Sequence, residues 1–275
     1  MLPSPQARFD FVEATSKGYR FVWHNRVLVG KLAGIPVLVK LGCLALIIAL
    51  ELSGNFLRQG LILLPSYFLE GWMLAYLVRT AIYDERGSSS LSGNQSQDEV
   101  FLRERARAIL AATLVYVLIK LVLSFSTGMV MDFQRSLIGE NGQSLHNIPD
   151  PSPGMMLVAL ALLGFFLWAF RYLWMNVSVA LGYGFREYAL KFRGGMISFY
   201  MIGTWLLCFV PFALVLVLCS ELLLSVIPAQ DGEPTALYRF LMTGVQAAVD
   251  TAISLVTAIA MAFGIREVMD GKSKK

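Results

Sequence analysis

The stretch from Ile197 to Pro228, ISFYMIGTWLLCFVPFALVLVLCSELLLSVIP, contains a single charged residue, Glu221. A helix needs about 20 mostly apolar residues to cross the hydrocarbon core of a bilayer, so this stretch can span it with some tilt. Pro211 lies near its centre, where the missing amide donor and the ring predict a kink. The stretch therefore predicts a transmembrane helix.

Five further segments have the same character. The six predicted spans are 35–53, 60–82, 108–131, 155–183, 197–228 and 237–264. Of the 275 residues, 56% are hydrophobic and 15% are charged, whereas a soluble domain carries about 25% charged residues. The predicted fold class is an all-α polytopic membrane protein with six transmembrane helices in a domain over 35–266. A cytoplasmic or interfacial segment over 1–34 precedes it, and a basic tail over 267–275 follows.

The distribution of basic residues predicts the orientation. Seventeen of the 23 Lys and Arg residues lie in the N-terminal segment, the second and fourth connections and the C-terminus. Three others, Arg58, Arg135 and Arg239, lie in the remaining connections. Because cytoplasmic connections are enriched in Lys and Arg, both termini are predicted to be cytoplasmic. The same rule explains the net charge of +4, so no nucleic-acid partner is expected.

The N-terminal segment has the pattern of an amphipathic helix. Its apolar stripe follows spacings of three and four and includes Phe9, Val12, Tyr19, Trp23 and Val27. Charged residues occupy the opposite side. We expect this helix either to lie in the headgroup region before the chain turns inward near Pro36, or to pack beneath the bundle.

Four ionisable residues lie near the middle of predicted spans: Glu70, Lys120, Arg171 and Asp250. A charge at the bilayer centre costs about 2.5 to 3.5 kcal/mol on insertion scales, so two acids and two bases at similar depth are expected to pair. Gln246 and Ser254 lie one helical turn before and after Asp250 and extend its polar stripe. The predicted midplane polar network consists of Glu70, Lys120, Arg171, Gln246, Asp250 and Ser254.

Two interpretations of this network stay open. It could form a polar pathway or a binding cavity, as in a transporter, or it could be a closed network that determines which helices pack together. Lys40, Glu51 and Glu221 are left out of it, because they lie nearer the ends of their predicted spans.

The sequence contains no pattern typical of a catalytic site, such as HExxH, GxSxG or a P-loop. Its two histidines, His24 and His146, lie outside the predicted spans, and one histidine among the scattered carboxylates of the loop 132–153 does not make a metal site. We therefore expect no catalytic residue, no metal and no cofactor.

Two segments carry a resemblance to a known group. These are ATSKGYRFVWHNRVLVGKL, which leads into the first span, and FREYALKFRGGMISFYMIGTWLLCFVP, which runs into the fifth. Both resemble poorly characterised bacterial six-helix inner-membrane proteins that are related to the membrane domain of glycerophosphodiester phosphodiesterases. The resemblance implies a location in the bacterial cytoplasmic membrane. That group has no agreed activity, so no catalytic residue carries over, and the soluble phosphodiesterase domain is not found in this sequence.

Together these observations favour a non-catalytic multi-pass membrane protein, a scaffold or accessory factor of the cytoplasmic membrane. The alternative is a small-solute transporter or lipid-handling protein that uses the midplane polar network. Membrane lipids and other membrane proteins are the expected partners, and the oligomeric state is left open.

Overall fold

The structure is a computed structural model that describes residues 9–50, 52, 56–85, 95–138, 153–227 and 235–271. The outer loop containing His146 and the last residues of the basic tail lie outside these ranges. Within them, the regular secondary structure is helical. The helices are α1 (Phe11–His24), α2 (Arg26–Ala49), α3 (Phe56–Ile62), α4 (Leu64–Tyr83), α5 (Gln95–Ile138), α6 (Pro153–Ala169), the 3-10 helix η4 (Phe170–Trp174), α7 (Met175–Ala180), α8 (Phe185–Lys191), α9 (Gly195–Val226) and α10 (Ala236–Asp270).

Four of the described helices, α2, α5, α9 and α10, are long and apolar enough to cross a membrane. A fifth candidate is the pair α3 and α4, which is bent by 57°. The predicted span over 155–183 is divided among α6, η4 and α7. The described part of the chain therefore contains four or five candidate spans rather than six, and the fourth predicted span, 155–183, is not one continuous helix.

Side-chain hydrogen bonds accompany the break in this predicted span. The Tyr188 hydroxyl donates to the backbone carbonyl of Arg171 at 2.6 Å, and Arg171 Nη1 donates to the carbonyl of Phe192 at 2.5 Å. A carbonyl bonded by a tyrosine is less available to the next helical turn, which favours the tighter 3-10 segment at this point.

The first long helix begins earlier than expected. The chain turns at Asn25, whose side chain donates to the carbonyl of Phe21 at 2.9 Å, and α2 then runs from Arg26 to Ala49 with Pro36 inside it. The expected turn near Pro36 is therefore wrong. As a consequence Lys40, which the predicted span 35–53 places near a helix end, lies well inside α2.

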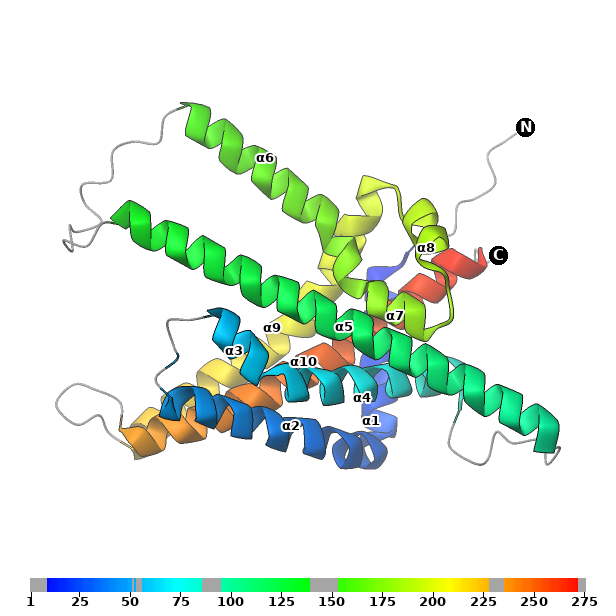
Figure 1. The fold of residues 1–275 in the computed structure, drawn as a ribbon, viewed down its shortest axis with the longest axis horizontal. Coiled ribbons are helices and arrows are strands. Elements are labelled where there is room, and N and C mark those ends of the chain that lie inside the picture. Colours follow the sequence, from blue (N-terminus) through cyan, green and yellow to red (C-terminus); the bar gives the residue numbers. More distant parts are fainter. Residues whose placement is uncertain are drawn as a thin grey trace.

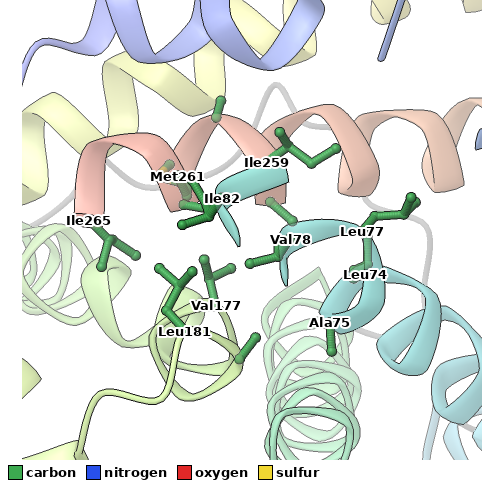
Figure 2. Close-up of a cluster of buried hydrophobic side chains, with 14 of the residues drawn as sticks. Leu74, Ala75, Leu77, Val78, Ile82, Val177, Leu181, Ile259, Met261 and Ile265 are labelled. Atoms are coloured by element: carbon green, nitrogen blue, oxygen red, sulfur yellow. The ribbon is translucent and has the colours of Figure 1, made fainter. Parts of the chain in front are cut away.

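The core is formed where α4, α7 and α10 meet at one end of the bundle (Figure 2). The labelled side chains of this cluster are Leu74, Ala75, Leu77, Val78, Ile82, Val177, Leu181, Ile259, Met261 and Ile265. Helix α10 is central, because 67% of its most apolar stretch is buried, against 6% for α9. The apolar surface of α9 therefore points outward, as expected of a helix that contacts lipid.

Helix α1 packs along α10 and α9 through its small residues. Its buried positions are Ala14, Thr15 and Gly18, and a Cβ at Gly18 would lie 3.0 Å from that of Ala260. Such close approach of helix backbones is typical of membrane proteins. The aromatic ring of Phe9 sits on Gly264, where a Cβ would come within 2.3 Å of the ring.

The predicted apolar stripe of α1 does not act as one face. Phe9 is buried and Tyr19 is half-buried, where it stacks on Phe212. In contrast, Val12 is 56% exposed and Trp23 is 69% exposed, and Val27 at the start of α2 is also exposed. The small-residue side of α1 thus packs against the bundle, whereas Val12 and Trp23 remain exposed.

Helix α6 and the two ends of α5 extend beyond this packed region (Figure 1). Figure 1 shows α6 leaving the other helices, and its main contacts are with η4 and α9. At about 1.5 Å per residue, the 44 residues of α5 are much longer than a bilayer core is thick. Many of the described side chains of α5 and α6 are apolar and exposed.

Candidate functional site

The most unusual feature of the interior is a polar layer across α2, α4, α5 and α10. Lys40 Nζ lies 3.5 Å from Glu70 Oε2 and 3.8 Å from Asp250 Oδ2. Glu70 is fully buried, Lys40 is almost so, and the Asp250 side chain is 49% exposed. One lysine therefore bridges two carboxylates of very different exposure.

Helix α5 adds a second lysine. Lys120 Nζ lies 5.4 Å from the ring centroid of Tyr116, and it interacts favourably with the charge of Glu70. Tyr116 can approach α4 because Gly71 has no side chain, and a Cβ there would lie 2.9 Å from the Tyr116 ring. The negative charges of Glu70 and Asp250 are thus matched in number by the positive charges of two lysines, Lys40 and Lys120.

Hydroxyl groups surround these charges. Tyr67 OH and Ser124 Oγ are 3.2 Å apart and link α4 to α5. Ser66 lies one turn before Glu70 and is also buried. The polar layer is defined here as Lys40, Ser66, Tyr67, Glu70, Tyr116, Lys120, Ser124, Asp250 and Ser254.

Several buried atoms of the polar layer make no hydrogen bond within the described part of the chain. They are both carboxylate oxygens of Glu70, the hydroxyl of Ser66 and that of Tyr116. The hydroxyls of Ser254 and Tyr116 lie close enough to Glu70 to interact with its carboxylate, although not with the geometry of an ordinary hydrogen bond. Because buried polar atoms are nearly always paired, this region has unused capacity to bind a polar group.

The sixth predicted span supplies the outer edge of the layer. Asp250 and Gln246, one turn apart on α10, are both exposed, whereas Ser254 is half-buried. The structure thus brings Glu70, Lys120, Asp250 and Ser254 together, with Gln246 at the rim. Lys40, which sequence reasoning left out, is their central contact.

Arg171 lies in a different environment. It is 2% exposed and its guanidinium stacks on Trp168 at 4.6 Å and on Tyr172 at 5.0 Å. Among the described residues, no carboxylate lies within ion-pair distance of it. Burial raises the pKa of the Tyr188 phenol, so this group stays protonated and donates to the carbonyl of Arg171. Arg171 therefore does not belong to the polar layer.

The other predicted positions have local roles. Pro211 lies inside α9, which continues on both sides of it. Tyr19 OH donates to the carbonyl of Cys208 at 3.2 Å and so ties α1 to α9 near that proline.

Sequence reasoning did not identify a second buried acid, Glu85, which is 5% exposed. Arg79 donates to both of its carboxylate oxygens, at 2.8 and 2.6 Å, and Arg105 Nε lies 3.3 Å from one of them. The chain can turn back toward Arg79 at the end of α4, because the backbone of Asp84 adopts a left-handed conformation with φ of 52°. The closeness of Glu85 and Arg79 in the sequence, six residues apart across the end of α4, could have indicated this ion pair.

No group of three or more potential metal ligands occurs among the described residues. The polar layer can hold charge, exchange a proton or bind a polar group. Comparisons with protein-family models, with curated proteins and with solved structures found no match.

Proposed function

We propose that this chain is a non-catalytic scaffold or accessory factor of the membrane, and that it holds a partner helix against the exposed edge of its polar layer. Several of its helices are compatible with a membrane protein. The proposal rests on one observation, the exposure of the Asp250 carboxylate in the middle of α10.

This exposure is unfavourable in hydrocarbon. A charged side chain at the centre of a bilayer costs about 2.5 to 3.5 kcal/mol, and Lys40 covers Asp250 on one side only. A transmembrane helix that carries a hydrogen-bond donor would neutralise the open side, and Gln246 would supply a second polar contact. The partner is therefore expected to present a Ser, Thr, Asn, Gln or basic side chain at the same depth.

The orientation that we propose places both termini in the cytoplasm. Arg79, Arg105 and Arg266 meet at one end of the bundle, where Arg266 donates to the carbonyl of Ile82. Lys17 joins the same end through Glu267. This gathering of basic residues supports the orientation. A bacterial cytoplasmic membrane is proposed from the resemblance of the two segments described above.

Site-directed photo-crosslinking tests the scaffold. A photoreactive residue in place of Gln246 should form a discrete protein adduct in membranes, and the same residue in place of Leu218, on the exposed surface of α9, should not. The adduct should disappear in the Asp250→Leu background and persist with Asp250→Asn, which retains hydrogen bonding. Lipid adducts alone from both positions would contradict the proposal, and an adduct of twice the chain mass would identify a second copy as the partner.

A second candidate, transport of a small polar solute or lipid handling, is favoured by the unused hydrogen-bonding capacity of Glu70, Ser66 and Tyr116. In that case the polar layer has to admit water or solute. A Ser254→Cys variant should then react with a membrane-impermeant thiol reagent in a cysteine-free background. Complete protection of Ser254→Cys, together with a protein adduct from position 246, would favour the scaffold.

A further inference from the structure

A cavity of about 480 Å³ lies where η4 meets α8. Its walls include three arginines, Arg171, Arg186 and Arg193, and the apolar side chains of Trp168, Phe185 and Leu190. Figure 1 shows α8 beside the C-terminal end of α10, the end at which Arg79, Arg105 and Arg266 also lie. The cavity thus belongs to the basic end of the bundle.

The cavity has positive charge without a matching acid. Arg186 and Arg193 are exposed and make no ion pair or side-chain hydrogen bond within the described part of the chain, and no residue that lines the cavity is acidic. Lys191, between them, donates instead to the carbonyl of Met269. Three arginines around one cavity repel each other unless an anion joins them.

Arg171 indicates where such an anion would bind. It is 2% exposed, and its Nε has no hydrogen-bond partner although Nη1 is held by the carbonyl of Phe192. The stacking on Trp168 and Tyr172 fixes the plane of the guanidinium. A buried donor that is held rigidly and left unpaired is ready to bind an acceptor oxygen.

The rest of the cavity wall suits an amphiphile. Trp168 is followed toward the other end of α6 by exposed apolar residues, among them Phe165, Leu160 and Leu157. These make an apolar surface that starts at the arginines and continues along the helix. A ligand with an anionic head and hydrocarbon chains matches both parts.

We infer that this cavity binds a phosphate group, and that the phosphate belongs to the headgroup of an anionic phospholipid whose acyl chains lie along α6. Arginine suits phosphate because its planar guanidinium can donate two parallel hydrogen bonds. The inference requires only that the chain lies in a membrane. It does not depend on the scaffold, because Asp250 and its partner helix involve different elements.

Lipid binding by the full chain tests the inference. The purified protein in detergent is titrated with phosphatidylglycerol or with zwitterionic phosphatidylcholine, and bound lipids are counted by native mass spectrometry. We expect phosphatidylglycerol to bind at least about tenfold more tightly, and the double variant Arg186→Gln with Arg193→Gln to remove that preference. Both arginines are exposed and unpaired, so this variant should fold.

Two matched variants give the controls. Arg20→Gln with Arg107→Gln removes the same charge from two exposed arginines that do not line the cavity, and it should leave the preference intact. Arg186→Lys with Arg193→Lys keeps the charge and should retain part of it. Equal binding of the two lipids by the wild type, or an equal loss in both Gln variants, would overturn the inference.

Inorganic phosphate distinguishes the two sources of the group. If it binds to the lipid-free protein and displaces phosphatidylglycerol only at concentrations far above those of the lipid, the apolar surface of α6 contributes and the ligand is a lipid. If it binds as tightly as the lipid, the cavity is still a phosphate site, but the assignment of its ligand to the membrane is overturned.

Discussion

The ammonium group of Lys40 lies 3.5 Å from a carboxylate oxygen of Glu70, inside a bundle that excludes solvent from that carboxylate completely. The two residues come from α2 and α4, and the same lysine reaches Asp250 on α10. Three helices are therefore joined through one cation. The pairing explains how a fully buried acid can persist in a chain of apolar helices.

Removing this lysine should destabilise the protein strongly. Lys40→Met leaves Glu70 buried without its nearest counter-ion, and loss of one partner of a buried pair costs about 3 to 5 kcal/mol. Thermal unfolding in detergent should show a clear decrease in Tm. Lys31→Met, at an exposed position of the same helix, is the control and should change Tm little. Adding Glu70→Gln to Lys40→Met should recover much of the loss, and failure to do so would show that the pair does not stabilise the bundle.

Glu70 and Arg171 are expected to be independent. They lie in separate clusters, and Arg171 is held by the carbonyl of Phe192. In a double-mutant cycle with Glu70→Gln and Arg171→Gln, the two free-energy changes should add to within about 0.5 kcal/mol. A coupling energy well above this in unfolding measurements would place the two side chains in one network after all.

Glu85 should contribute far more to the stability of the fold than an exposed glutamate that is also paired with an arginine. It is buried between Arg79 and Arg105, so Glu85→Ala should cost about 3 to 5 kcal/mol. Glu99 pairs with Arg103 at 3.2 Å on the exposed side of α5, and Glu99→Ala should cost less than about 1 kcal/mol. Similar unfolding midpoints for the two variants would contradict the structural role of Glu85.

The docking of α1 should depend on Gly264. A Cβ at this position would lie 2.3 Å from the buried ring of Phe9, so Gly264→Ala should displace the start of α1 and make it more sensitive to protease. Gly34→Ala is the matched control, because nothing lies within 4 Å of its Cβ and alanine is favoured over glycine in a helix by about 1 kcal/mol. Equal protease resistance of the two variants would refute this account of α1.

High pH should also weaken the attachment of α1. Burial alone lowers the pKa of Lys17, but its bonds to Glu267 and Glu13 outweigh this effect and raise the pKa above its ordinary value of 10.5. Burial also raises the pKa of Tyr19 from 10.0 to about 12. A raised pKa means that the stabilisation is fully present below the ordinary value and is lost as the pH rises through the raised one.

This pH effect is measured as protease sensitivity of α1 between pH 9 and pH 12, where we expect a rise above about pH 10. Lys17→Met should remove the part of the change due to Glu267, and Tyr19→Phe the part due to the phenol. A response that is unaltered in the variant carrying both changes would assign the effect to other groups.

Some of this architecture could be predicted from local sequence. Long apolar stretches have to be helices in a membrane, because no water is available to bond an open backbone, and α9 and α10 were recognised in this way. Glu70, Lys120 and Asp250 were selected by the same logic, since hydrocarbon rejects charge wherever the chain places it. These are properties of a segment and its solvent, and they do not require knowledge of the neighbouring helices.

Which charges meet was decided by the tertiary structure. Lys40 joins Glu70 and Asp250 because α2 begins at Arg26 and crosses α4 and α10 at that level, whereas Arg171 is turned toward α8 by the break at η4. The sequence by itself determined that the chain is helical and apolar and that its few central charges need partners. The choice of partners depends on the rotation and crossing of helices far apart in the chain, so only their packing could decide it.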